Sequence, residues 1–495
     1  MPWKDSKIRL GSEVFAKMER LRILIVRSFD DVSFCDGLNY LSNELRVLDW
    51  FKCPFEFLPS SFHGEKLIDF RIEESNVRDL GTRLQSKNLT SIDLSYCEYL
   101  TNISDLSSCS NLEKLSFHRC TSLVEVHDSV GFLDKLVELD FRDCSSLKNL
   151  PRSFKLRSLE LLKLDGCTSL ENFPEIECEM KYLRCVELKS CVIQELPSSI
   201  TYLIGLETLY INECNSLVHF PVNIFQLEYL QDVCILYCPN FVNFGKEVGH
   251  NGQFVSCTQE NEISSIMELS PPESNNLFRT FNFSSSLKTL NLSGSGIGSL
   301  PPCIEGFVGL SKLDLTYCKQ LEEILHLPPN VEEVYAEGCS GLKNFLPESN
   351  NLSRTYNFSS SLRTLNLSGS GIVSLPPCIE GFVGLSYLCL RNCKQLEEIL
   401  HLPPNIESFE AIGCVLLERF PHVSTESSFG TPDLKRLRRI NLSECNKVEV
   451  DVGNHAPDPL LVQERFREKD SSTIIYPGSI DSKVVQVLQG GYFIK

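Results

Sequence analysis

The chain has 495 residues, of which 42% are hydrophobic and 23% charged, so it can bury a large core and is not expected to be disordered. Its 47 basic and 65 acidic side chains give a net charge of −18, which disfavours nucleic acid and anionic membranes because both require a positive surface. No apolar run approaches the ~18 residues of a membrane-spanning helix. The partners we expect are therefore proteins.

The first ten residues argue against export. They contain Lys4, Asp5, Lys7 and Arg9, where a secretory signal needs an uninterrupted apolar core. We expect a cytoplasmic protein whose 22 cysteines are thiols rather than a disulfide framework. Residues 1–20 are interpreted as an N-terminal flank with a cap helix.

Internal repeats dominate the chain from residue 21 onward. The pattern Leu-x-x-Leu-x-Leu-x-x-Cys occurs seven times in succession, with starts 23 or 24 residues apart at Leu89, Leu112, Leu136, Leu159, Leu183, Leu206 and Leu230. Weaker copies bring the number of coils to seventeen, with starts at Leu21, Leu45, Leu67, Leu287, Leu310, Val331, Leu362, Leu385, Ile406 and Leu437. This period is typical of leucine-rich repeats and predicts an α/β repeat fold, a leucine-rich-repeat solenoid or horseshoe.

Each coil has two halves with different patterns. The x-Leu-x-Leu-x segment alternates with period two, which predicts one short strand per coil and a parallel sheet on the concave side. The opposite half carries Leu-Pro or Phe-Pro pairs ending at Pro151, Pro174, Pro197, Pro221, Pro301 and Pro376. Because proline fixes φ and lacks an N–H, this half is predicted to be an irregular or short-helical convex side rather than a second sheet.

Twelve cysteines occupy the ninth position of the repeat: Cys97, Cys120, Cys144, Cys167, Cys191, Cys214, Cys238, Cys318, Cys339, Cys393, Cys414 and Cys445. Zinc sites need two close cysteine pairs such as C-x₂-C, and this chain has no pair with that spacing. We interpret this cysteine ladder as small buried thiols that close the turn after each strand.

The repeats run from 21 to 244 and from 286 to 421, with a terminal repeat at 422–445. Between them, residues 245–285 are polar and are interpreted as a looped-out insertion, either a solvated linker or a binding loop. Residues 286–330 reappear at 361–405 with six differences in 45 positions, which marks a tandem duplication of 75 residues. Four of those differences fall on outward positions of one strand.

No catalytic, cofactor or metal site is predicted. The glycines from Gly294 to Gly298 lack the spacing of a dinucleotide loop, and the nine histidines show no H-E-x-x-H pattern. The basic run KRLRR at 435–439 fits a solvated face, since Leu437 is in repeat register, and nuclear import is the alternative.

Function is expected on the outward side chains of the strands, because solenoids of this kind bind proteins with that surface. Tyrosine and arginine are enriched among interface hot spots, so Arg119, Arg142, Tyr210 and Tyr237 are the preferred contacts. The whole predicted protein-binding set is Tyr96, His118, Arg119, Arg142, Lys163, Lys189, Tyr210, Leu236, Tyr237, Tyr317, Tyr335 and Tyr387.

Several segments resemble one known family, the plant TIR-type nucleotide-binding leucine-rich-repeat disease-resistance proteins. SEVFAKMERLRILIV (12–26) resembles the junction into their first repeat, CVIQELPSSI (191–200) and LPPNVEEVYAEGC (327–339) their body and final coils, and STIIYPGS (472–479) the first strand of their post-repeat β-sandwich. The resemblance implies an intracellular immune receptor. Its repeats would recognise a pathogen effector or hold an auto-inhibitory contact with a nucleotide-binding module.

Two departures from the family accompany this resemblance. The chain has no G-x-x-x-x-G-K-[ST] phosphate loop, so we expect no nucleotide switch in it, and residues 446–495 are expected to be a truncated post-repeat segment. Two alternatives stay open. One is a ubiquitin-ligase substrate adaptor, although about 20 residues before the first coil are too short for an F-box. The other is a receptor remnant that binds but does not signal.

Overall fold

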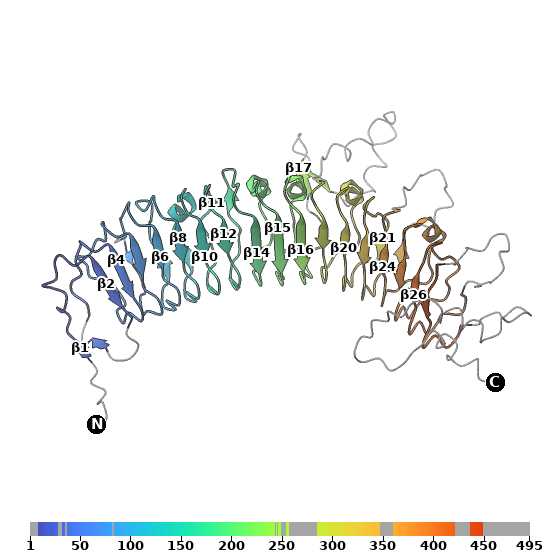
Figure 1. The fold of residues 1–495 in the computed structure, drawn as a ribbon, viewed down its shortest axis with the longest axis horizontal. Coiled ribbons are helices and arrows are strands. Elements are labelled where there is room, and N and C mark those ends of the chain that lie inside the picture. Colours follow the sequence, from blue (N-terminus) through green and yellow to red (C-terminus); the bar gives the residue numbers. More distant parts are fainter. Residues whose placement is uncertain are drawn as a thin grey trace, which may run out of the picture. The chain divides into compact units, whose positions relative to one another are not determined.

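The computed structural model describes residues 8–27, 32–34, 37–81, 84–242, 244, 246–248, 254–256, 285–346, 360–420 and 436–448. The chain divides into two compact units, residues 1–256 and 257–495 (Figure 1). Most of the predicted insertion, residues 422–435 of the predicted terminal repeat and residues 449–495 lie outside the described residues, so those domain boundaries stay predictions. Within the insertion, β17 (Lys246–Val248) pairs antiparallel with β18 (Phe254–Ser256).

Unit 1 contains a parallel sheet to which each coil contributes one strand. Equivalent residues lie side by side, as Ile92, Leu115, Leu139 and Leu162 do in neighbouring coils. This register follows from the regular repeat length, because successive coils stack directly on one another. The ten strands are β2 (Ile23–Val26), β4 (Val47–Trp50), β5 (Asp69–Arg71), β6 (Ser91–Asp93), β8 (Lys114–Ser116), β10 (Glu138–Asp140), β12 (Leu161–Lys163), β14 (Cys185–Lys189), β15 (Thr208–Asn212) and β16 (Asp232–Leu236).

Unit 2 repeats this arrangement. Leu290, Leu313 and Val334 of its first three strands lie side by side, and so do Leu365 and Leu388 of the next two strands. Every predicted coil thus supplies a strand, and the predicted leucine-rich-repeat solenoid is confirmed. The seven strands are β19 (Thr289–Asn291), β20 (Lys312–Asp314), β22 (Glu333–Tyr335), β24 (Thr364–Asn366), β25 (Tyr387–Cys389), β26 (Ser408–Glu410) and β27 (Arg439–Asn441).

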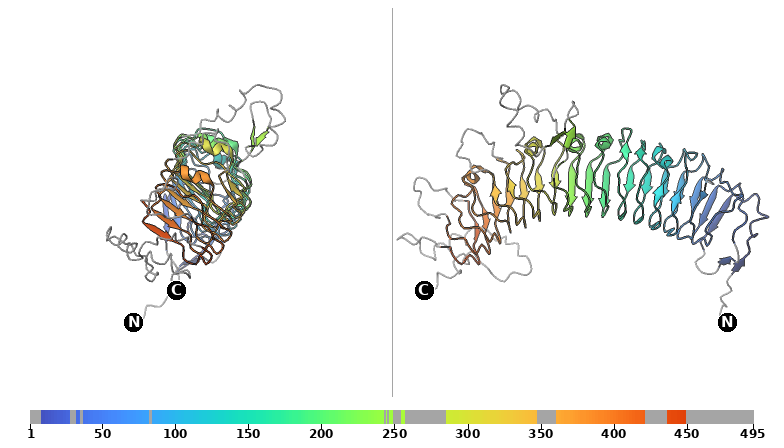
Figure 2. Two further views of the ribbon diagram at one scale, coloured as in Figure 1. Left: turned by 90° about the vertical axis from the view of Figure 1, so that its right-hand side faces the viewer. Right: turned by 180° about the vertical axis from the view of Figure 1, so that it is seen from behind.

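The other half of the coils carries short 3₁₀ helices, which lie along one edge of the arrays (Figures 1 and 2). Of the five in the described ranges, four start directly after a proline in extended conformation, as η3 does after Pro197. The prediction of turns and short helices on this side is therefore confirmed, and the described ranges contain no α-helix. The helices are η2 (Asp128–Phe132), η3 (Ser198–Tyr202), η4 (Val222–Gln226), η8 (Pro302–Gly306) and η9 (Pro377–Gly381).

The expectation that this side has no sheet is wrong. Two-residue strands pair in parallel between adjacent coils. Stacking brings extended segments of neighbouring coils side by side, so their backbone groups can pair even without an apolar alternation. The pairs are β7 (Asn102–Ile103) with β9 (Glu125–Val126), β11 (Ser153–Phe154) with β13 (Glu175–Ile176), and β21 (Glu323–Ile324) with β23 (Asn344–Phe345).

The predicted cap helix in residues 1–20 is also wrong for the described part of that flank. Residues 8–10 form β1 (Ile8–Leu10), which pairs in parallel with β3 (Val32–Phe34). Residues 12–17 form turns closed by bonds such as that from the Val14 N–H to the Gly11 carbonyl. The run between Gly11 and β2 is too short for an isolated helix to offset its nucleation cost.

Candidate protein-binding surface

The outward side of the two parallel sheets, which we call the strand face, presents alternate residues of each strand. In β6, Ile92 is buried whereas Ser91 and Asp93 lie outward. The residue before the ninth repeat position follows each strand, and we call these residues the turn row. In unit 1 the turn row is Lys52, Glu74, Tyr96, Arg119, Asp143, Gly166, Ser190, Glu213 and Tyr237, and in unit 2 it is Gly294, Tyr317, Gly338, Gly369, Asn392, Gly413 and Glu444.

Every turn-row residue has a left-handed backbone, with φ between 49° and 76°. Residues with a Cβ pay roughly 1–2 kcal/mol for this conformation, and only glycine adopts it freely. Eleven of the sixteen positions nevertheless carry a side chain. Four of the predicted contacts, Tyr96, Arg119, Tyr237 and Tyr317, are among them. Because the left-handed backbone disfavours a side chain at these positions, the side chains found there do not serve backbone stability. This favours a role for them at the surface.

Removing one turn-row side chain should therefore not destabilise the coil. For Tyr237→Gly, with φ of 51° and a side chain 52% exposed, we expect the free energy of unfolding to stay constant or rise by up to about 1 kcal/mol. The matched control is Leu236→Gly, one residue earlier in β16, which should lose about 1 kcal/mol. Urea unfolding followed by circular dichroism measures both. Equal losses in the two variants would refute the argument.

Tyr96, His118 and Arg119 form one cluster across two adjacent coils. The Tyr96 and His118 rings meet edge to face, with centroids 5.0 Å apart, and the Arg119 guanidinium lies 5.6 Å from the Tyr96 ring. Asp143 of the next coil lies 3.6 Å from His118 Nε2 and 3.9 Å from Arg119 Nε. The arginine side chain is 56% exposed. These contacts hold an aromatic and cationic group at the surface, a combination enriched at interfaces.

Arg142 and Lys163 both interact with the buried carboxylate of Asp140. The Asp140 side chain is only 4% exposed and accepts bonds of 3.0 Å from Arg142 Nε and 2.6 Å from Arg142 Nη2. Lys163 Nζ lies 3.6 Å from the same carboxylate and 2.5 Å from Glu138 Oε1. Although burial opposes ionisation, the bonds from Arg142 and the charge of Lys163 hold the pKa of Asp140 below its ordinary value. Asp140 thus fixes the two cations at the outer surface.

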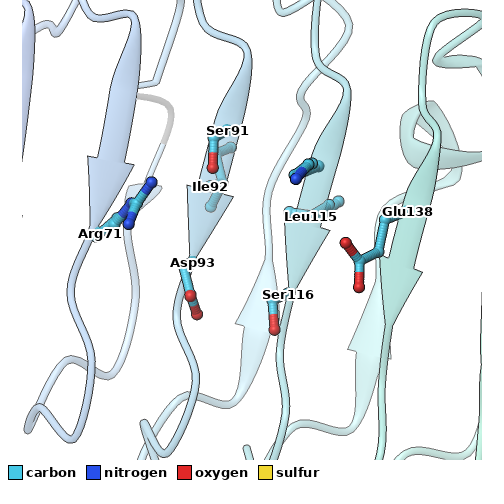
Figure 3. Close-up of a pocket in the computed structure, with 8 residues that line it drawn as sticks. Arg71, Ser91, Ile92, Asp93, Leu115, Ser116 and Glu138 are labelled. Carbon is cyan, nitrogen blue, oxygen red and sulfur yellow. The ribbon is translucent and has the colours of Figure 1, made fainter.

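Beside this cluster lies a hollow of about 200 Å³ on β5, β6, β8 and β10 (Figure 3). The short side chains of Ser91 and Ser116 form part of its lining, between the long side chains of Arg71, Lys114 and Glu138. Lys114 is exposed and has no ion pair with another described residue. Sequence reasoning missed this hollow, although the outward serines between long charged residues were its signal.

Lys189 lies near side-chain oxygens that accept no hydrogen bond from another described residue. It pairs in register with Asn212, and its charge acts on Asp165 in the preceding coil. Asp165 Oδ1 and Asn212 Oδ1 are buried and have no hydrogen-bond partner among the described residues. Burial raises the pKa of Asp165 and, together with Asp165, that of Glu187. Buried acceptors without donors are costly, and because both oxygens are covered they are not open to the N–H of a partner.

The remaining predicted contacts of unit 1 lie on β15 and in or directly after β16. Tyr210 is half-buried between Glu187 and Cys234, and burial followed by these neighbours raises its pKa. Leu236 ends β16 with partial exposure, and Tyr237 follows it in the turn row. The predicted residues of unit 1 therefore line one continuous surface from β6 to β16.

In unit 2 the predicted tyrosines divide between the two duplicated segments and their neighbours. The Lys312 ammonium lies over the ring of Tyr335 in β22, 5.2 Å from the ring centroid. Tyr317 follows β20 in the turn row and is 49% exposed. Tyr387 is separate, on β25, where burial first and Cys389 second raise its pKa. The three tyrosines therefore lie in three different coils.

The cysteine ladder is structural. All twelve ladder cysteines are buried free thiols, and most donate to a main-chain carbonyl of the preceding coil, as Cys144 Sγ does to Phe117 at 3.0 Å. Burial raises the pKa of Cys97 and Cys167 to about 12, which leaves their thiols unreactive. In the described ranges no three His, Cys, Asp or Glu residues are placed to hold a metal ion, and no helix is long and apolar enough to cross a membrane.

These features define a leucine-rich-repeat array with a rigid side-chain surface, and comparisons specify its type. Residues 154–328 match the family model described as the leucine-rich repeats of RPS4B-like disease resistance proteins. Over part of its repeat region the chain is similar to plant TIR-type disease-resistance proteins, which confirms the resemblance inferred from the sequence.

Among the relatives are disease resistance proteins RUN1 and RPV1 of Vitis rotundifolia, 37% identical over 161 residues and 33% over 158 residues. TMV resistance protein N of Nicotiana glutinosa is 31% identical over 138 residues. Each match covers 27% of this chain but only 12%, 11% and 12% of the respective relative. A solved leucine-rich-repeat protein of Leptospira interrogans is 18% identical, with a TM-score of 0.36 over 77% of this chain and 92% of its own.

Proposed function

We propose that this chain is the non-catalytic protein-recognition region of a plant immune receptor, acting in the cytoplasm or nucleus. Its strand face would bind a pathogen effector or the nucleotide-binding module of the receptor. The observation that carries the proposal is the continuous surface from Tyr96 to Tyr237 in unit 1, where Arg119 packs on Tyr96 and Arg142 is held by the buried Asp140. The match to disease-resistance repeats supports the immune context.

The mechanism follows from differential binding. A ligand shifts a resting-to-active equilibrium only by as much as it prefers one state. If the strand face holds an auto-inhibitory contact, an effector that occupies the same residues releases that contact. Neither step needs catalysis, because leucine-rich-repeat solenoids act as binding surfaces.

The test replaces Arg119, Tyr210 and Tyr237 together by alanine. Arg142 is kept, because its loss would leave the buried Asp140 carboxylate without its arginine partner. The chain is expressed in leaf tissue with separate nucleotide-binding modules and with candidate effectors, and co-purification is quantified. We expect the triple variant to lose at least about tenfold in recovery of a partner that the unchanged chain retains, since hot-spot losses exceed 1–2 kcal/mol.

The control carries alanine at Tyr182, Tyr202 and Tyr229, which are 56%, 49% and 53% exposed and lie outside the strand face. It should co-purify like the unchanged chain. Unchanged recovery of every partner by the strand-face variant would reject the proposal.

A further inference from the structure

The two duplicated segments carry different strand faces on one scaffold. Among their six differences, Lys312, Asp314, Thr316 and Tyr317 in the first copy correspond to Tyr387, Cys389, Arg391 and Asn392 in the second. Strands β20 and β25 have the same length and pair in the same register with their neighbours. The duplication has therefore kept the backbone and changed the side chains that a partner meets.

Tyr317 is presented as a fixed ring with one free face. A Cβ placed on Gly338 of the next coil would lie 2.4 Å from Tyr317 Cδ1 and 2.7 Å from Cε1, so the ring occupies the space above that glycine. The residue is 49% exposed. The left-handed backbone of Gly338, with φ of 72°, already favours glycine at this position. The absence of a side chain on Gly338 also leaves the space that the Tyr317 ring occupies. Restricting the ring in advance lowers the entropy cost of binding.

The surroundings of Tyr317 are acidic. The strand face of β20 and the following coil carries Lys312 and the carboxylates of Asp314, Glu332, Glu333 and Glu337, of which Glu332 is ion-paired with Arg363 of the next coil. Lys312 lies on the ring of Tyr335, not on Tyr317. The Tyr317 N–H donates to the Glu337 carbonyl at 2.6 Å, which places the exposed Glu337 next to the tyrosine.

The second copy supplies its own cation. Arg391, at the position of Thr316, donates from Nε to Glu410 Oε2 at 2.7 Å, and Glu410 is 5% exposed. Asn392 replaces the tyrosine, and Ser408 and Ile412 replace two of the carboxylates. The same scaffold thus satisfies an arginine internally in one copy and leaves an aromatic, acidic surface in the other.

We propose that the β20–β22 face is a docking surface for a basic segment of a protein partner. An arginine or lysine of that segment would lie on the free face of Tyr317, with Glu337 balancing its charge, an arrangement that combines a cation–π contact with a charged hydrogen bond. The acidic surroundings disfavour nucleic acids and anionic lipids as occupants. The inference rests on the proposed function in that it assigns a partner chemistry to part of the strand face.

The experiment uses the full chain and a fluorescein-labelled peptide of alternating arginine and glycine, with a glutamate–glycine peptide of equal length as the counter-probe. Fluorescence anisotropy measures Kd for the unchanged chain and for Tyr317→Asn and Glu337→Gln. The asparagine is the second copy's own residue, with φ of 57° against 61°, so the backbone tolerates it. We expect the arginine peptide to bind roughly fivefold to tenfold more weakly to each variant.

Matched controls remove the same groups elsewhere. Tyr229→Asn removes a tyrosine that is 53% exposed outside the strand face, and Glu323→Gln removes a carboxylate from β21 on the other side of the coil. Both should bind like the unchanged chain. Equal weakening in variants and controls, no binding of the arginine peptide, or equal binding of the glutamate peptide would each overturn this inference. The alanine variant of unit 1 tests the proposed function separately, so the two failures are distinguishable.

Discussion

Replacing Arg391 by threonine should lower the free energy of unfolding by about 3–5 kcal/mol. The Glu410 carboxylate lies outward on β26, but it is almost completely covered, with a side-chain exposure of 6%. Arg391 Nη2 and Nε both donate to Glu410 Oε2, at 2.5 and 2.7 Å. Without the arginine the carboxylate stays buried with no cation to balance it. The measurement is chemical denaturation of the variant and the unchanged chain at neutral pH.

The first copy provides the rescue for this variant. At the positions of Arg391 and Glu410, the first copy and the coil after it carry Thr316 and Tyr335, a combination that the same backbone accepts. The double variant Arg391→Thr/Glu410→Tyr should therefore recover most of the lost stability. Glu410→Tyr alone should cost no more than about 1 kcal/mol, because Arg391 is 50% exposed and stays solvated. A threonine variant within about 0.5 kcal/mol of the unchanged chain would show that Glu410 is not held by this pair.

The fold could be predicted because the repeat carries the same information seventeen times. A single Leu-x-x-Leu-x-Leu segment is ambiguous, but a constant spacing of 23 or 24 residues leaves stacked coils as the simple explanation. Buried leucines such as Leu115 and Leu139 then align by register. The cysteine ladder was predictable for the same reason, since its position in the repeat coincides with the turn after each strand.

The elements outside the strand and its turn could be predicted only in part. The Leu-Pro pairs indicated the 3₁₀ helices, but the strand pairs β7–β9 and β11–β13 have no sequence pattern of their own. They arise from stacking, which a reading of one coil at a time does not contain. The flank before the first coil was misjudged because its apolar residues allow a helix, whereas Phe15 instead packs edge to face on Trp50, with ring centroids 6.0 Å apart.

The candidate surface shows a similar division. Outward positions follow from alternation, so the predicted contacts lie on the strand face, in the turn row or, like His118 and Arg142, between the two. What holds them could not be read from spacing: the burial of Asp140 beneath Arg142, and the seat that Gly338 makes for Tyr317, depend on contacts between coils. The left-handed turn row was also missed. Its signal was present, because glycine recurs at that position at Gly166, Gly294, Gly338, Gly369 and Gly413.

The duplication separates two roles of glycine that the sequence alone presents as equivalent. Gly309→Ala should destabilise the chain by about 3 kcal/mol or more, because the new Cβ would lie 1.9 Å from the Ser285 carbonyl oxygen and 2.6 Å from its carbon. Both atoms belong to backbone of the preceding coil, so a shift would disturb the stacking itself. The gain in helix or chain entropy from alanine, at most about 1 kcal/mol, does not offset this clash.

Gly298→Ala is the matched control for Gly309→Ala. The nearest atom to its new Cβ would be the Gln320 carbonyl oxygen at 3.9 Å, and the second copy carries Val373 at this position. We expect no loss of stability, whereas Gly384→Ala, the second-copy equivalent of Gly309, should lose as much as Gly309→Ala, since its Cβ would lie 2.0 Å from the Ser360 carbonyl oxygen. Thermal and urea unfolding of the three variants decide the matter. If Gly309→Ala and Gly298→Ala unfold alike, close backbone approach between coils is not what requires glycine there.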